Sequence, residues 1–348
     1  MSYTPPAKIF RATAVLILPV VFGTISLFGC RNAPPDAGSD SLSVLTTVEP
    51  IAFFLTEIAD GHIAVETLVP AGKEPETFAP TLRTVQRFAA CSVYFRVGLA
   101  CEEPLLARLT TMNSRLKIVD LRDSIPESFH APAGCGHDGG HEGGEGDDTH
   151  EAPTDGSAPE HAENHTADHD HAPSGCGDGG LDPHLWMSPA VMKGAVRTMT
   201  ESLASMAPEH RSEFEQNRDD LIRRLEELER QISERLEGRT NRNIYVFHPA
   251  YGYFCEQFGL QQRAMEEGGR TPSPKDLADW IARIGAERVG TIIAQPEFGE
   301  SYFRALAESV SVNIEIHSPL LPDYFANLGR LTDLICAEEL EKGEKSPP

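Results

Sequence analysis

Two series of alternating strand and helix patterns lie along the chain, one from residue 42 to 119 and one from residue 243 to 336. In the first, short runs rich in β-branched and aromatic residues alternate with segments whose apolar residues recur at helical spacing. The pattern predicts strands at 42–48, 64–69, 92–97 and 116–119, and helices at 50–60, 81–89 and 102–112. Such alternation is typical of a parallel sheet covered by helices.

The second series repeats this alternation. It predicts strands at 243–247, 261–265, 288–294 and 311–316, and helices at 250–258, 273–285, 299–309 and 321–336. Ligands of parallel sheets bind in the loops at the carboxyl ends of the strands. Those loops are therefore where we look for chemistry.

A long amphipathic segment joins the two series. Ser188 and Pro189 fit the N-cap and first position of a helix expected to end near Met206. The next helix, residues 211–236, would be about 39 Å long. Its apolar residues fall on one stripe: Phe214, Leu221, Leu225, Leu228, Ile232 and Leu236. We expect a rigid strut, with a coiled-coil dimer seam as the alternative. The predicted fold class is α/β, with two lobes of mainly parallel sheet joined by a long rigid helix.

The N-terminus has the pattern of an export signal. Lys8 and Arg11 precede an apolar run at residues 12–28, which ends in Leu27-Phe28-Gly29-Cys30. These last residues resemble a bacterial lipobox, in which the cysteine is lipidated and becomes the new N-terminus. An ordinary signal peptide and an N-terminal membrane helix are the alternatives. All three place the rest of the chain outside the cytoplasm.

These patterns predict the division of the chain. We expect a signal peptide at 1–29, a lipid-anchored tether at 30–41, an N-terminal β/α lobe at 42–207, a linking helix at 208–238, a C-terminal β/α lobe at 239–337 and a tail at 338–348. Without the leader, tether and an inserted loop at 130–180, on the order of 250 residues remain, enough for two domains of ordinary size.

The inserted loop has the composition of a metal-binding tract. It contains no Lys or Arg, many carboxylates and the histidines His130, His137, His141, His150, His161, His165, His169 and His171. Imidazole beside carboxylate is a ligand set for zinc, and a segment with so little to bury is expected to be disordered. We predict an accessory metal loop. A plain acidic linker is the alternative.

Charge and cysteines narrow the class of protein. The net charge is −23, about half of it in the loop, which argues against nucleic acid as a partner. Besides Cys30 there are six cysteines, which can pair in an oxidising compartment, although the sequence does not define the connectivity. Cys135 and Cys176 each stand in Gly-Cys-Gly near the ends of the loop. They could form a disulfide, which we favour slightly, or bind metal as thiolates.

Three candidate ligands follow predicted strands or the loop. Glu76 comes after the second strand, His184 ends the insertion, and His248 directly follows the strand at 243–247. A single histidine in such a position is more often structural or exposed. The joint pattern is what indicates a metal site.

Two motifs carry a family resemblance: Asp182-Pro183-His184-Leu185-Trp186-Met187-Ser188-Pro189 and Phe247-His248-Pro249-Ala250-Tyr251-Gly252-Tyr253-Phe254. With the lipobox, the loop and the long helix, residues 41–336 resemble the metal-binding receptors of bacterial ABC transporters for zinc and manganese. The resemblance implies one divalent ion in the interlobe cleft, an ABC permease with its ATPase as partners, and a periplasmic protein anchored to the membrane by lipid. The His-rich insertion resembles that of the zinc-specific branch. We expect a monomer.

The chain departs from the family pattern at two ligand positions. Glu76 stands where the family usually has its first histidine, which makes the site harder and more tolerant of manganese or iron. The family's last carboxylate usually precedes Pro-Leu, but here the sequence is Ser318-Pro319-Leu320. We take His317 as the fourth candidate, with Glu315, Asp323 or water as alternatives.

The expected function is capture of a divalent metal, most simply Zn²⁺ with Mn²⁺ as the alternative, for an ABC importer. A periplasmic zinc buffer or a surface adhesin is the rival without transport. A metallohydrolase would also use two histidines, one carboxylate and a bound water. Because the chain has no HExxH helix pair and no nucleophile motif, we expect it not to be an enzyme.

Overall fold

The structure is a computed structural model that describes residues 42–129, 182–266, 273–298 and 312–344. All of them belong to one compact unit. Several predictions lie outside the described residues: the signal peptide, the tether with Cys30, the loop at 130–180 with its histidines and cysteines, and the helix at 299–309. Among the described residues, no helix has the length and apolar character that a membrane crossing requires.

The first sheet contains β1 (Ser43–Thr46), β2 (Ala64–Thr67), β3 (Val93–Arg96) and β4 (Lys117–Asp120). The strand order is β2-β1-β3-β4, and every neighbouring pair is parallel. Val44 and Leu45 are buried in different hydrophobic clusters, because successive side chains of a strand point to opposite faces. The Leu45 cluster includes residues of α2 (Leu82–Phe88) and α3 (Glu102–Met112), whereas the Val44 cluster includes residues of α1 (Glu49–Ala59).

The second sheet repeats this topology with β5 (Asn243–Val246), β6 (Gln261–Ala264), β7 (Thr291–Ala294) and β8 (Asn313–Ile316). Its order is β6-β5-β7-β8, again with parallel pairs. Tyr245 packs in a cluster with Trp280 and Ile284 of α7 (Pro274–Glu287), which begins at a capping box formed by Ser273 and Asp276. The neighbouring residues Ile244 and Val246 belong to the cluster that contains Val44. The predicted fold of two parallel α/β lobes is confirmed.

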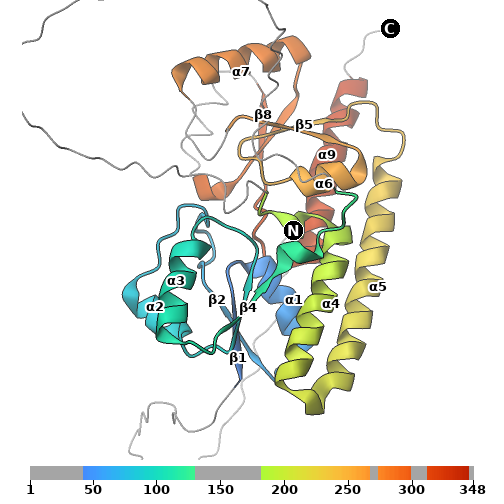
Figure 1. The fold of residues 1–348 in the computed structure, drawn as a ribbon. Helices are drawn as coiled ribbons and strands as arrows, with labels where there is room; N and C mark the ends of the chain where they lie inside the picture. Colours follow the sequence, from blue (N-terminus) through green and yellow to red (C-terminus); the bar gives the residue numbers. More distant parts are fainter. Residues whose placement is uncertain (1–41, 130–181, 267–272, 299–311, 345–348) are drawn as a thin grey trace, which may run out of the picture. The chain divides into compact units, whose positions relative to one another are not determined.

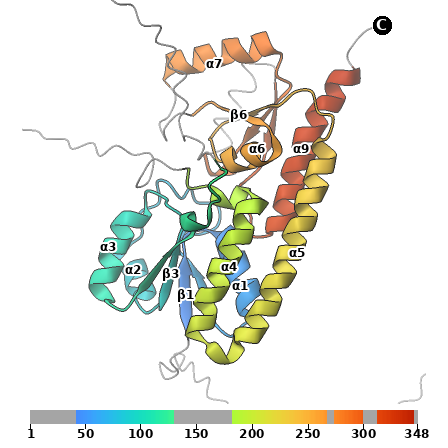
Figure 2. The same ribbon diagram turned by 45° about the vertical axis from the view of Figure 1, so that its right-hand side comes forward.

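Two long antiparallel helices, α4 (Pro189–Met206) and α5 (Arg211–Leu236), lie side by side (Figures 1 and 2). The oxygen of Ser188 caps α4 by accepting a hydrogen bond from Val191 N. All six residues of the predicted α5 stripe are buried within the chain. The stripe therefore has its partner inside the molecule, and a coiled-coil seam is not needed to explain it.

The last helix, α9 (Tyr324–Glu344), follows the second sheet but packs on elements of the first series. The rings of Tyr324 and Phe54 lie 4.7 Å apart, and α9 also contacts α5 (Figure 2). A single hydrophobic cluster contains residues of α1, α4, α5, α6 (Gly252–Phe258), α9 and both sheets. This shared core fixes the strand ends of the two sheets relative to each other within the described unit.

The four described cysteines are free: Cys91, Cys101, Cys255 and Cys336. The first three are buried and the last is half-buried. Burial raises the pKa of the Cys101 thiol to about 12 and also raises the pKa of Cys91 and Cys255, so these thiols are held protonated and inert.

Candidate metal centre

Three side chains from separate loops converge at the carboxyl ends of the strands. Glu76, His184 and His248 each bring one donor atom to a group whose members all lie within 4.8 Å of one another. His184 Nε2 lies 3.4 Å from His248 Nε2, and Glu76 Oε1 lies 3.3 Å from His248 Nε2 and 4.0 Å from His184 Nε2. The structure thus brings together three of the four residues that the sequence suggested.

The backbone of His248 lies just after β5 and is hydrogen-bonded to a glutamine that follows the neighbouring strand. Its backbone N donates to Gln295 Oε1 at 3.2 Å, and its carbonyl oxygen accepts from Gln295 Nε2 at 2.9 Å. Gln295 directly follows β7, which pairs with β5. Both residues are buried. The His248 backbone is therefore rigid without any ligand, as a preorganised site requires.

His184 is positioned by the residue two places before it. One carboxylate oxygen of Asp182 accepts from His184 N at 2.8 Å and from His184 Nδ1 at 2.7 Å. The carbonyl oxygen of Asp182 accepts from the hydroxyl of Tyr253, which ties this segment to α6. Trp186 Nε1 donates to the carbonyl oxygen of Pro319, so the segment is also fixed to the loop after β8.

Glu76 lies on the more open side of the group. The Glu74 carboxylate accepts from the backbone N atoms of Glu76 and Thr77 at 2.7 and 3.0 Å, which shapes the loop. The Glu76 side chain keeps 24 % of its surface exposed, against 8 % for His184 and 6 % for His248. Burial favours neutral Glu76, but His248 and His184 outweigh this effect and hold its pKa below the ordinary value.

Each histidine has a carboxylate behind its other ring nitrogen. Asp182 accepts from Nδ1 of His184, and Glu266 accepts from Nδ1 of His248 at 2.7 Å. This arrangement directs both Nε2 atoms toward Glu76 and is usual behind metal-binding histidines. Burial opposes charging of His248, but Glu266 and Glu76 outweigh it and raise the pKa of His248 to about 10. In the metal-free protein His248 therefore carries a proton that a metal ion must displace.

The spacing of the donors fits a small divalent ion. Bonds of about 2.0–2.1 Å in a tetrahedron place neighbouring donors about 3.3–3.4 Å apart. Two of the three measured separations match this value, and the third is longer by a shift that the partly exposed Glu76 can supply. The cavity between the groups has a volume of about 20 Å³, which is room for one ion or one water.

The structure does not bring His317 to this group. The ring of His317 is buried, with Nδ1 3.1 Å from the Tyr251 hydroxyl and Nε2 3.2 Å from the carbonyl oxygen of Asn327. Burial lowers the pKa of His317 to about 4, which the Asn327 carbonyl only partly offsets. Of the alternatives, Glu315 accepts from the Asn313 side chain, and Asp323 accepts from Ala326 N near the start of α9. Neither lines the cavity.

Glu297 lines the same cavity and was missed by the sequence analysis. It lies in the short 3-10 helix Pro296–Phe298 that follows β7. One of its carboxylate oxygens accepts from the Ser318 hydroxyl, while the other is buried without a hydrogen-bond partner among the described residues. The rule that selected Glu76 and His248, a donor just past a strand end, would also have selected Glu297.

The comparisons with known proteins identify the family. The family model described as zinc-uptake complex component A, periplasmic, matches residues 44–335, so the chain belongs to that family. The chain is 26 % identical over 285 residues to the high-affinity zinc uptake system protein ZnuA of Yersinia pestis, covering 80 % of this chain and 83 % of that protein. It is 29 % identical over 297 residues to ZnuA of Haemophilus influenzae, covering 83 % of this chain and 87 % of that protein.

A solved structure shows the same fold. A crystal structure of ZnuA aligns with a TM-score of 0.68 at 22 % identity, over 86 % of this chain and 99 % of that chain. The two-lobed fold of zinc-uptake receptors is thus shared along nearly the whole described chain.

Proposed function

We propose that this protein captures a divalent metal ion, Zn²⁺ first, outside the cytoplasm and delivers it to an ABC importer. The observation that carries the proposal is the convergence of Glu76, His184 and His248 on a cavity the size of one ion. Its relatives named as zinc uptake proteins and its membership in a family of solute-binding receptors support the same function.

The proposed ligands are His184 Nε2, His248 Nε2 and a carboxylate oxygen of Glu76. We assign the fourth position to Glu297, because the residue lines the same cavity and one of its carboxylate oxygens is buried without a hydrogen-bond partner among the described residues. Its side chain would move toward the ion, since its oxygens are not part of the group within 4.8 Å. Two imidazoles and two carboxylates suit zinc but also tolerate manganese, which favours carboxylate oxygen. Manganese is therefore the second candidate ion, because Glu76 stands where the family usually has a histidine.

Release must be as easy as capture in a transport receptor. His184 and His248 lie on rigid, buried segments, whereas Glu76 lies on a loop that is more exposed. We expect the Glu76 loop to move when the ion enters or leaves. A closed structural zinc site would instead have all of its ligands buried on rigid backbone.

The test is a zinc titration in competition with a chelator of known affinity, with a variant lacking residues 130–180 beside the full chain. The deletion is feasible because Phe129 and Asp182 both contact Tyr253: the Phe129 ring lies 6.1 Å from the Tyr253 ring, and the Tyr253 hydroxyl donates to Asp182 O. A short glycine linker can join the two ends.

One tight zinc equivalent that survives the deletion and is lost in His184→Ala or His248→Ala supports the receptor function. If tight binding disappears with the loop, the protein is a tethered zinc buffer instead. Transport itself is tested by zinc-limited growth of a strain that carries each variant, with a permease-null strain as the control.

Hydrolysis is the alternative that would use the same ligands. Two histidines, one carboxylate and a bound water would match a catalytic zinc site with an open position. Zinc-dependent turnover of generic ester, peptide or phosphate substrates would overturn the receptor function.

Membrane attachment through Cys30 is tested by detergent partitioning of the wild type and Cys30→Ser. The monomeric state is tested by analytical ultracentrifugation with and without zinc.

A further inference from the structure

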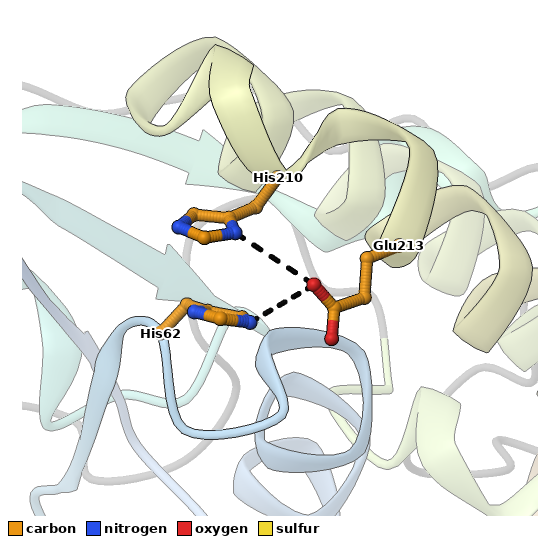
Figure 3. Close-up of side chains that lie close together, drawn as sticks. All are labelled: His62, His210 and Glu213. Carbon is orange, nitrogen blue, oxygen red and sulfur yellow. Dashed lines mark hydrogen bonds and ion pairs between the residues drawn. The ribbon is translucent and has the colours of Figure 1, made fainter.

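A second group of metal-binding side chains lies on the N-terminal lobe, away from the cleft. His62 follows α1, and His210 and Glu213 lie where α4 gives way to α5; their donor atoms all lie within 4.8 Å of one another (Figure 3). Glu213 Oε2 lies 3.0 Å from His62 Nε2 and 3.7 Å from His210 Nδ1. Both imidazoles thus face the same carboxylate oxygen.

The local backbone brings these residues together. Asp60 ends α1 in the left-handed region at φ 44°, Gly61 follows at φ 83°, and His62 N donates to the carbonyl oxygen of Ala59. This tight turn directs His62 toward the start of α5. His210 closes the short 3-10 helix Pro208–His210 between α4 and α5, and Glu213 lies in the first turn of α5.

The two histidine rings are stacked. Their centroids lie 3.6 Å apart with an interplanar angle of 20°. Phe214, which is fully buried, lies about 6 Å from both rings, at 6.1 Å from His62 and 6.0 Å from His210. The rings are therefore placed by apolar contact on one side, while one nitrogen of each ring, His62 Nε2 and His210 Nδ1, faces the Glu213 carboxylate (Figure 3).

The chemistry of the group is that of a zinc-class site. Two imidazole nitrogens and one carboxylate oxygen are a common donor set for zinc, with remaining positions left to water. If both stacked histidines were charged, two cations would share one carboxylate. A divalent ion between neutral rings and the carboxylate uses the same three donors without that repulsion. The nearby cation Arg211 is engaged with Glu201 and Glu215 at 3.7 and 3.3 Å.

Exposure sets the kind of site. The side chains of His62, His210 and Glu213 keep 30 %, 34 % and 44 % of their surface exposed. The rings must turn out of their stacked arrangement so that the in-plane lone pair of each nitrogen points at the ion, which this exposure allows, and the group can take an ion directly from solvent. Such a site exchanges faster and binds more weakly than the buried cleft.

The site is separate from the cleft. His62 precedes β2 and Glu76 follows it, so the two groups belong to opposite ends of that strand, which is itself about 13 Å long. No residue is common to both. Metal binding by His62, His210 and Glu213 is therefore independent of the proposed cleft function.

We propose that His62, His210 and Glu213 form a second divalent metal site, selective for zinc-class ions, that links the α1–β2 turn to the α4–α5 junction. An ion bound there cross-links the α1–β2 turn to the start of the linking helix. It adds a low-affinity binding position to the surface and stabilises the start of α5.

The test follows the ring signals of His62 and His210 by NMR in the full chain labelled with ¹⁵N-histidine. The two signals are assigned with His62→Gln and His210→Gln. Zinc is added beyond the first equivalent, and the concentration at half-change is read for these two rings alone. The half-change is read against free zinc fixed by a chelator buffer, so zinc bound by the cleft or by residues 130–180 does not shift it, and failure of the cleft is seen separately on His184 and His248.

We expect both rings to shift together, with loss of the ring proton that faces Glu213. Glu213→Gln should raise the half-change concentration about tenfold or more, since even supporting partners of metal ligands contribute at least that factor. Glu209→Gln is the matched control, because it removes the same charge from the adjoining 3-10 helix without removing a donor, and it should leave the value unchanged.

Two results overturn the proposal. In one, the His62 and His210 signals stay unperturbed at millimolar zinc. In the other, Glu213→Gln and Glu209→Gln raise the half-change concentration equally. That result would mean that Glu213 acts only through its negative charge and does not coordinate the ion. Far-ultraviolet circular dichroism of each variant confirms that the chain is folded.

Discussion

The Nδ1 atom of His248 lies 2.7 Å from a carboxylate oxygen of Glu266, on the side of the ring opposite to Glu76. Glu266 is buried and comes from the end of β6, a strand that pairs with the one before His248. This contact sets the orientation of the ring and makes Nε2 a stronger donor to a metal ion.

The first prediction concerns this supporting carboxylate. Glu266→Gln should weaken zinc binding by about 10- to 100-fold without touching a ligand, because the ring loses its charged acceptor. The measurement is chelator competition in the variant that lacks residues 130–180. Glu315→Gln, a partly exposed carboxylate of the same lobe, is the control and should have no effect. Equal affinities for Glu266→Gln and wild type would show that the contact is only structural.

The second prediction separates Glu297 from His317 as the fourth donor. Glu297→Gln should lower zinc affinity by about tenfold or more, since a direct ligand contributes at least as much as a supporting partner. His317→Gln should change stability and leave zinc affinity nearly unaltered, because both ring nitrogens of His317 face protein atoms. The opposite pattern in the same competition assay would restore His317 as the ligand.

The third prediction concerns metal preference. Glu76→His should raise the ratio of zinc to manganese affinity, because imidazole suits zinc and carboxylate suits manganese. Competitive titration of both metals against one fluorescent chelator gives this ratio directly. Lys73→Gln, an exposed residue of the same loop that does not line the cavity, serves as the control. A ratio that falls in Glu76→His would mean that Glu76 does not coordinate the ion.

The fourth prediction concerns the proton that is released when zinc binds. The pKa of His248 is raised to about 10, so the ring is protonated in the metal-free protein near neutral pH, and zinc must displace that proton. Zinc affinity should therefore rise by about tenfold per pH unit between pH 6 and 8. Calorimetry at pH 7 in buffers of different ionisation enthalpy should show release of about one proton. Binding without proton release would contradict the assignment of His248.

The fifth prediction concerns acid stability. The pKa of His317 is lowered to about 4, while the unfolded chain protonates near 6.5. The contribution of a neutral His317 is complete above pH 6.5 and is lost as pH falls toward 4, by up to about 3 kcal/mol. Urea unfolding at pH 7 and pH 5 should show a smaller pH dependence in His317→Gln than in wild type. Equal slopes would mean that the buried ring contributes nothing to acid sensitivity.

Local patterns in the sequence predicted most elements within a few residues. Helices α3 and α5 have the bounds that the apolar spacing indicated, Glu102–Met112 and Arg211–Leu236. Their spacing reports which residues of one segment face the core, and this is a local property. Among the helices that the structure describes, only α9 is clearly longer than expected, since it continues past residue 336 to Glu344.

Charge pairs on α5 were less predictable. The sequence suggests the i,i+4 pairs Asp219 with Arg223, Asp220 with Arg224, and Glu226 with Arg230, but the pairing in the structure is different. Arg223 pairs with Asp220, Arg224 reaches Glu57 on α1, and Arg230 pairs with Glu227 and Glu234. Each long arginine side chain can reach several nearby carboxylates, and a neighbouring helix adds further carboxylates that the sequence of α5 does not show.

By itself the sequence determined the two series of strands and helices, the linking helix, and the loops that carry Glu76, His184 and His248. The spacing of apolar residues and the position of a residue after a strand can both be read from the local sequence. Only the tertiary structure decided that Glu297 faces the cavity while His317 turns to Tyr251 and Asn327, and that His62 meets His210 and Glu213. Those outcomes depend on the direction of single side chains across segments distant in sequence, which no local pattern encodes.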